Sequence, residues 1–129
     1  MTGRRMTWAI VLCWLCLLGD GGTGLMLLTV PHVALDRMGV ASPPAELVYI
    51  RYIGVFVSFA GLAYALPLLR REALRTVFEL TLLLRLMVAT FVTGAMLVHA
   101  LDPGWWSVPL YDGVLAILQA CWLVAERRS

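Results

Sequence analysis

The sequence predicts an all-α membrane protein: a four-transmembrane-helix bundle with up-down-up-down topology, forming one domain over residues 1–129. Hydrophobic residues make up 61% of the chain, compared with about 45–50% in soluble domains, and mean hydropathy is +0.87. These residues form four long apolar runs, and the polar segments between the runs are too short for a second domain. The predicted spans are residues 6–30, 47–69, 76–100 and 108–125.

The second predicted span, residues 47–69, is the most clearly defined. A helix rises about 1.5 Å per residue, so this run can cross a hydrocarbon core roughly 30 Å thick. Its only charged residue is Arg51, which shares a helical face with small residues: Gly54, Ser58, Gly61 and Ala65. Because small residues let membrane helices approach closely, we expect Arg51 to face protein rather than lipid.

The first predicted span allows two interpretations. Arg4 and Arg5 precede an apolar core at Trp8–Leu18, and small residues follow at Gly19–Gly24, which is the layout of a signal peptide. However, no A-x-A-like cleavage site is present, and the apolar run resumes at Leu25–Val30. We therefore favour a retained transmembrane helix that is loosened at its glycines.

The polar segments mark the ends of the spans. Prolines and glycine punctuate residues 31–46, which predicts a loop, with a short interfacial turn or helix over Val33–Met38. An Asp-Pro-Gly turn begins at Asp102, and Trp105 and Trp106 after it suit a membrane interface.

Arginine asymmetry predicts the orientation. Seven arginines lie at the two termini and in the connection between spans two and three: Arg4, Arg5, Arg70, Arg71, Arg75, Arg127 and Arg128. The loops on the other side hold only Arg37. By the positive-inside rule, both termini face the cytoplasm and the protein lies in the cytoplasmic (inner) membrane. Arginines at the ends of apolar runs also argue against nucleic-acid binding.

Charged residues within the spans form the candidate site. Each costs about 2.5–3.5 kcal/mol at the centre of a membrane helix, so we expect opposite charges to pair. Four are predicted to meet in the outer half of the bundle with zero net charge: Asp20, Arg51, Arg85 and Asp112. Gln119 shares the helical face of Asp112. Glu79 follows Arg75 by one turn and is predicted to form an interfacial ion pair with it.

The predicted polar centre has two interpretations that the sequence leaves open. It is either a structural element that fixes how the four helices pack, or the wall of an outward-facing pocket for a polar or anionic group such as a quinone or lipid headgroup. His32 and His99 lack a spaced set of metal ligands, so no metal site is predicted.

Cys13 and Cys16 form a C-x-x-C motif within the first span. Such a pair is found in DsbB-like and vitamin K epoxide reductase-like enzymes, which are small helical membrane proteins that use a quinone. Disulfide relay also needs partner cysteines outside the membrane, and the remaining cysteine, Cys121, lies in an apolar run. We therefore expect apolar packing at Cys13 and Cys16, with a quinone-linked thiol oxidoreductase as an alternative function.

Short motifs occur over most of the chain: Pro31, Met38-Gly39-Val40, Arg51-x-x-Gly54, Gly61-Leu62-Ala63-Tyr64, Arg85 and Asp112. With these motifs the chain resembles the DoxX-like group of small bacterial four-helix membrane proteins. The resemblance implies a four-span protein in which Arg51, Arg85 and Asp112 share a polar centre of unassigned role. DoxX itself is associated with membrane oxidoreductase complexes, a role that does not transfer without a partner.

The function predicted from these observations is non-enzymatic. We expect the polar centre to bind a small hydrophobic ligand or a membrane partner, with membrane lipids around it and a homodimer as one form of partner. No cofactor is expected, apart from the quinone that the redox alternative would use. A further alternative is a transporter subunit similar to small multidrug resistance proteins, which have four short spans and a glutamate in the first. Here the acidic residue is Asp20, and the predicted arginine partners leave it no uncompensated charge.

Overall fold

The computed structural model describes residues 3–41 and 43–128, so residues 1, 2, 42 and 129 of the predicted domain lie outside the described residues. These ranges contain α1 (Gly3–Thr29), α2 (Pro31–Met38), α3 (Leu47–Ala63), α4 (Ala65–Leu69), α5 (Leu74–Leu97) and α6 (Ser107–Arg127), with 3₁₀ turns η1 (Arg71–Ala73) and η2 (Pro103–Trp106). Four segments within them are long and apolar enough to cross a membrane: Gly3–Thr29, Leu47–Leu69, Arg71–Leu97 and Pro103–Arg127. The prediction of an all-α protein with four candidate spans is confirmed, and the chain is a small multi-pass membrane protein.

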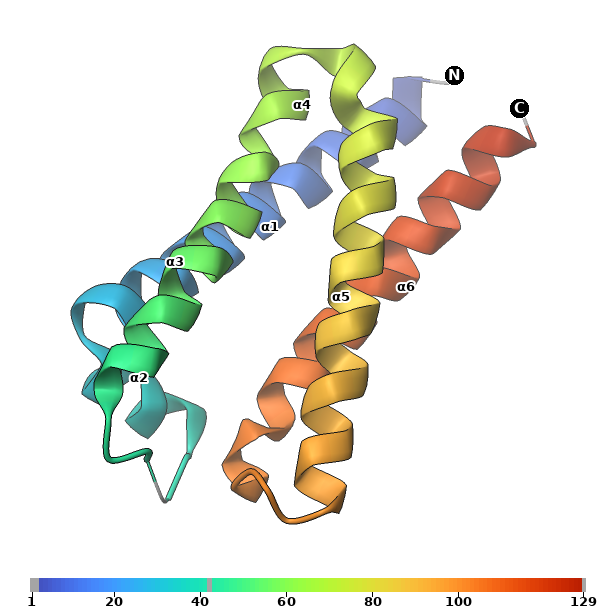
Figure 1. Ribbon diagram of the computed structural model, residues 1–129. Coiled ribbons are helices and arrows are strands. Elements are labelled where there is room, and N and C mark those ends of the chain that lie inside the picture. Colours follow the sequence, from blue (N-terminus) through green and yellow to red (C-terminus); the bar gives the residue numbers. More distant parts are fainter. Residues whose placement is uncertain (1–2, 42, 129) are drawn as a thin grey trace.

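The helices pack as two hairpins (Figure 1). α1 packs along α3 to form the N-terminal hairpin, and α5 packs along α6 to form the C-terminal hairpin. Both chain ends lie at the same end of the bundle, called here the termini end, and α2 and η2 lie at the opposite loop end. At the termini end, Arg5 Nη1 donates to the carbonyl oxygen of Ala125 at 3.0 Å. The first and last helices are therefore in direct contact.

Glycines set the close approach of α1 and α3. A Cβ atom on Gly54 would lie 2.7 Å from the backbone nitrogen of Leu28, and one on Gly61 would lie 2.8 Å from the Cα atom of Gly21. The predicted small-residue face of the second span therefore packs against another helix. The prediction that the glycines loosen the first span is wrong, because α1 continues without a break from Gly3 to Thr29. Two of these glycines, Gly21 and Gly24, instead allow the close packing against α3.

An apolar core joins the two hairpins towards the termini end. Its largest side chains include Phe78 on α5 and Trp122 on α6, whose rings meet edge to face with centroids 5.1 Å apart. Ala9, Leu12, Cys13 and Cys16 of α1 belong to the same buried cluster. A smaller cluster lies at the loop end, where α2 covers α1 and α3: Leu27, Ala34, Leu35, Val40 and Ile50.

The two turns at the loop end touch each other. The short helix predicted at Val33–Met38 forms as α2, which has a proline at its first position. Gly39 ends this helix with a φ of 77°, the left-handed conformation that glycine adopts most readily. A Cβ atom on Gly104 of η2 would lie 2.7 Å from the carbonyl carbon of Gly39. Only a residue without a side chain fits at this contact.

Candidate functional site

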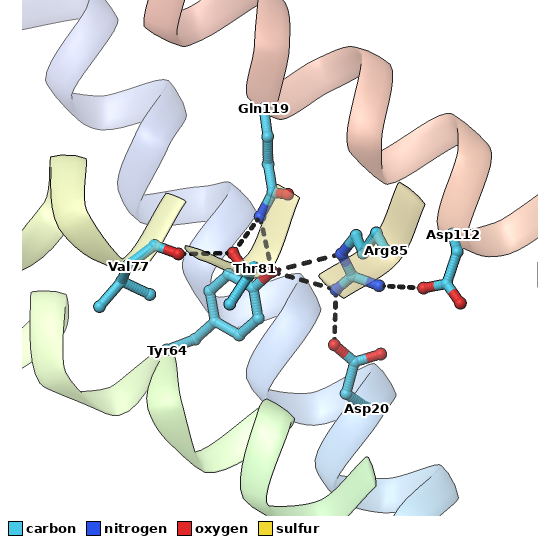
Figure 2. A network of polar contacts seen from close by, with 7 residues as sticks. All are labelled: Asp20, Tyr64, Val77, Thr81, Arg85, Asp112 and Gln119. Atoms are coloured by element: carbon cyan, nitrogen blue, oxygen red, sulfur yellow. Dashed lines mark hydrogen bonds and ion pairs between the residues drawn. The ribbon is translucent and has the colours of Figure 1, made fainter. Parts of the chain in front are cut away.

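A buried set of polar side chains lies between the two hairpins (Figure 2). α1 supplies Asp20, the junction of α3 and α4 supplies Tyr64, and the C-terminal hairpin supplies the other members. We call this set the Arg85 cluster: Asp20, Tyr64, Thr81, Arg85, Asp112 and Gln119.

Arg85 is the centre of the cluster. Its Nη2 atom donates to Asp20 Oδ2 and its Nη1 atom donates to Asp112 Oδ1, both at 2.5 Å. The side chains of Arg85, Asp20 and Asp112 are 4%, 9% and 13% exposed, respectively. Hydrogen bonds between ionised groups are about twice as strong as neutral ones. Pairing of this kind is the usual way in which charges are held inside a membrane protein.

Tyr64 supplies the second contact between the hairpins. Its hydroxyl oxygen accepts from Arg85 Nε at 3.3 Å and from Arg85 Nη2 at 3.2 Å. The guanidinium carbon also lies 5.7 Å from the centroid of the Tyr64 ring, within the range of a cation–π interaction. Tyr64 sits where the second span breaks into α3 and α4. Pro67 explains the break, because it has no N–H to bond the carbonyl of Ala63 four residues earlier.

Gln119 extends the cluster towards the termini end. Its Nε2 atom donates to the Tyr64 hydroxyl at 2.5 Å and to Thr81 Oγ1 at 3.1 Å. Thr81 in turn donates to the carbonyl of Val77 at 2.6 Å. Gln119 is 0% exposed, and its Oε1 atom has no hydrogen-bond partner among the described residues. The cluster therefore contains a buried acceptor as well as its charged groups.

Arg51 lies outside the Arg85 cluster, so the predicted balance of two aspartates and two arginines is wrong. Its side chain is exposed, and Nη1 donates to the carbonyl oxygen of Leu28 at 3.1 Å. Leu28 belongs to the last turn of α1, where backbone carbonyls have no partner within the helix. Arg51 therefore caps the end of α1. One guanidinium is left between two carboxylates, which together carry one excess negative charge when both are ionised.

The structure thus brings together Asp20, Arg85, Asp112 and Gln119 from the predicted set. Sequence reasoning did not assign Tyr64 or Thr81 to the site. Thr81 lies one turn before Arg85 on the same helical face, so the helical period alone could have assigned it to the site. The position of Tyr64 in the cluster depends on the helix break caused by Pro67. The sequence predicts a break near this proline, but it does not predict the direction in which the Tyr64 side chain points.

Tyr111 is a further neighbour of the cluster. Its ring centroid lies 5.6 Å from the guanidinium carbon of Arg85, and its hydroxyl interacts with the carboxylate of Asp20. A Cβ atom on Gly19 would lie 3.3 Å from Tyr111 Cζ, so the missing side chain makes room for the ring. Tyr111 is 41% exposed, and it therefore connects the buried charges to the outside of the bundle.

A shallow groove runs along α6 beside Tyr111. It has a volume of about 370 Å³ and is lined by Trp106, Ser107, Leu110, Tyr111, Val114 and Leu115. We call it the Tyr111 groove. Its walls are almost wholly apolar. Its link to the polar cluster is Tyr111, which lines the groove and also lies beside Arg85.

The two cysteines of the C-x-x-C motif are free thiols, and both are 0% exposed. They pack in the apolar core with Phe78 and Leu12. Thiol exchange requires an accessible thiolate, and buried structural cysteines are inert. The structure therefore gives no support to redox chemistry at Cys13 and Cys16. No group of three or more residues suited to holding a metal ion occurs within residues 3–41 and 43–128.

The protein thus has a buried, charged junction, the Arg85 cluster, between its two hairpins. The Tyr111 groove lies beside this junction. The spans and the polar contacts are all formed by residues of this one chain. Compared with known proteins, the chain matches no protein-family model, no curated protein and no solved structure.

Proposed function

We propose that this protein binds a hydrophobic small molecule whose apolar part lies in the Tyr111 groove and whose polar end reaches the Arg85 cluster. The observation that supports the proposal is the charge of the cluster. Two carboxylates share one guanidinium, and leaving an uncompensated charge inside a membrane is costly. A ligand that supplies a positive charge or a hydrogen-bond donor would lower this cost.

The donor and acceptor inventory defines the class of ligand. An ionised carboxylate only accepts hydrogen bonds, and the hydrogen bonds from Arg85 engage one oxygen of Asp20 and one of Asp112. The second carboxylate oxygen of Asp112 suits a ligand with an N–H or O–H group. A protonated lipophilic amine fits best, and a neutral alcohol or phenol fits less well. A quinone only accepts hydrogen bonds, so it complements these groups poorly.

Asp112 is the residue that we assign to ligand binding. It follows Tyr111 directly in the chain, and its side chain is more exposed than that of Asp20, at 13% compared with 9%. Tyr111 lines the groove and faces Arg85, so we assign the polar end of a ligand in the groove to the more exposed of the two carboxylates, Asp112.

The proposal can be tested with three probes that share one alkyl chain: dodecylammonium, dodecanol and dodecyl methyl ether. Binding to the protein in phosphatidylcholine nanodiscs would be measured by calorimetry, with Asp112→Asn as the reference that corrects for partition into lipid. We expect wild-type binding above this reference in the order amine, alcohol, ether. Arg51→Gln is the matched control, and it should bind like the wild type. Equal binding of the amine by the wild type and Asp112→Asn would contradict the proposal.

A transporter subunit is a second candidate, favoured by the position of Arg51. Small multidrug resistance proteins use an uncompensated acidic residue, and with Arg51 outside the cluster this chain also has one excess carboxylate. Proteoliposomes with an imposed pH gradient distinguish the two functions. Uptake of tetraphenylphosphonium that depends on the gradient and on Asp112 would indicate transport, whereas binding without uptake would indicate a binding protein.

We also propose a membrane location and a family for this protein. Seven arginines at the termini end support a position in the cytoplasmic (inner) membrane with both termini in the cytoplasm. A fluorescent protein fused to the C-terminus should then fluoresce, and alkaline phosphatase fused at the same point should be inactive.

Membership of the DoxX-like group is supported by Arg85, Asp112 and the four-span layout. The place of Arg51 differs from the shared polar centre that this resemblance implies.

A further inference from the structure

A second groove lies at the termini end of the bundle, between the start of α1 and the end of α6. It has a volume of about 480 Å³ and is lined by Arg5, Ala120, Cys121, Val124, Ala125 and Arg128. We call it the Arg128 groove. At a rise of about 1.5 Å per residue, Ala120 lies roughly 12 Å deeper along the helix than Arg128. The groove therefore has a positively charged mouth and an apolar floor that extends into the membrane.

The charges around this mouth are not balanced within the protein. The termini end holds the seven arginines, compared with three acidic residues, Glu72, Glu79 and Glu126. Glu79 is already shared, since it contacts Arg75 at 3.0 Å and Arg127 at 3.8 Å. This bears out the predicted pair of Arg75 with Glu79.

The two arginines of the groove remain available to a ligand. Arg128 forms no ion pair or side-chain hydrogen bond with any residue in the described ranges. Arg5 donates from Nη1 to the carbonyl of Ala125, and a guanidinium has five N–H groups in all. The bond to Ala125 fixes the position of Arg5 at the end of α6, with further donors free.

We infer that the Arg128 groove binds an anionic phospholipid from the adjacent leaflet. Its phosphate would lie between Arg5 and Arg128, and one acyl chain would lie along Ala120, Cys121 and Val124. Arginine favours phosphate because its planar N–H groups match the phosphate oxygens. Charge complementarity to the unbalanced mouth argues for an anionic headgroup over a zwitterionic one. The inference is independent of the ligand proposed for the Arg85 cluster.

Cys121 supplies a native reporter for the test. It is the exposed cysteine of the described chain, whereas Cys13 and Cys16 are fully buried. A bimane attached to Cys121 in nanodiscs would be quenched by a lipid with brominated acyl chains that enters the groove. We expect brominated phosphatidylglycerol to quench at a lower membrane fraction than brominated phosphatidylcholine. Addition of soluble inorganic phosphate should not reverse this quenching, because a free anion lacks the acyl chain.

Three variants locate the site. An arginine near an anionic surface is worth about a fivefold change in binding, so Arg128→Gln should raise the half-quenching fraction of phosphatidylglycerol about fivefold. Arg5→Gln should do the same, and circular dichroism would check that the loss of its bond to Ala125 leaves the fold intact. Arg70→Gln is the matched control: it removes the same charge at the same end but does not line the groove, and it should quench like the wild type.

Three results would overturn the inference. The first is equal quenching by the two brominated lipids, which would show no preference for the anionic headgroup. The second is an effect of Arg70→Gln as large as that of Arg128→Gln, which would assign the preference to overall charge. The third is reversal by inorganic phosphate, which would show that the groove holds an anion rather than a lipid.

Discussion

Arg85 Nη2 and Asp20 Oδ2 lie 2.5 Å apart although the two residues are 65 positions apart in the chain. Asp20 belongs to the N-terminal hairpin and Arg85 to the C-terminal hairpin. The same guanidinium also holds Asp112 within its own hairpin. One side chain therefore joins two helical units and neutralises part of the acidic charge between them.

Replacement of Arg85 should be severely destabilising. Arg85→Gln leaves the two buried carboxylates without a positive partner, and removal of one member of a buried ion pair typically costs about 3–5 kcal/mol. The free energy of unfolding would be measured by denaturant titration in detergent micelles. Arg51→Gln is the control, because Arg51 is exposed and donates to a backbone carbonyl rather than to a buried carboxylate. An equal loss in both variants would contradict the central role of Arg85.

Neutralisation of one aspartate should cost much less. Asp112→Asn keeps an oxygen that can accept from Arg85 Nη1 and leaves one aspartate paired with one arginine, so the cluster becomes neutral. We expect its loss in the free energy of unfolding to be under about 1 kcal/mol, the usual net worth of one hydrogen bond. If Asp112→Asn unfolds as readily as Arg85→Gln, both carboxylates are required for the fold and the excess charge is not available to a ligand.

Alanine substitutions at two helix glycines, one at the contact between α1 and α3 and one away from it, should have opposite effects on stability. Gly61→Ala places a methyl group against the backbone of Gly21, and overpacking of this kind costs about 1–3 kcal/mol. Gly94→Ala on α5 meets no atom within 4 Å, and in a helix interior alanine is favoured over glycine by about 0.8–1 kcal/mol. Thermal unfolding should therefore move down for the first variant and up for the second. A lower midpoint for both would indicate that the helices pack differently.

Thiol labelling should distinguish the three cysteines. Cys121 lies on the outer surface of the bundle and the other two are buried free thiols, so a membrane-permeable maleimide added to the protein folded in detergent should modify one cysteine per chain. Intact-mass spectrometry would count the labels, and denaturation should then expose all three. Rapid labelling of Cys13 or Cys16 in the folded protein would reopen the redox alternative.

The positions of the spans and of most charged groups followed from the sequence, because hydropathy and helical period act locally. Asp20, Arg85 and Asp112 were expected to meet, since unpaired charges are costly at similar depths in a membrane. Arg51 was misplaced because it found a different partner, the Leu28 carbonyl at the end of α1. That partner depends on where α1 ends and how closely α3 approaches it, and neither is visible in a hydropathy pattern. The contact of Tyr64 with Arg85 likewise depends on the helix break before Pro67.

A double-mutant cycle between Asp20 and Arg85 tests the central claim most directly. The free energy of unfolding would be measured for Asp20→Asn, Arg85→Gln and the double variant, with a parallel cycle for Asp20 and Arg51. Groups in direct contact typically couple by about 0.5–3 kcal/mol. We predict a coupling of about 1–3 kcal/mol between Asp20 and Arg85 and none that can be measured between Asp20 and Arg51. Additive effects for Asp20 and Arg85, or coupling of Asp20 to Arg51 instead, would contradict the arrangement of charges described here.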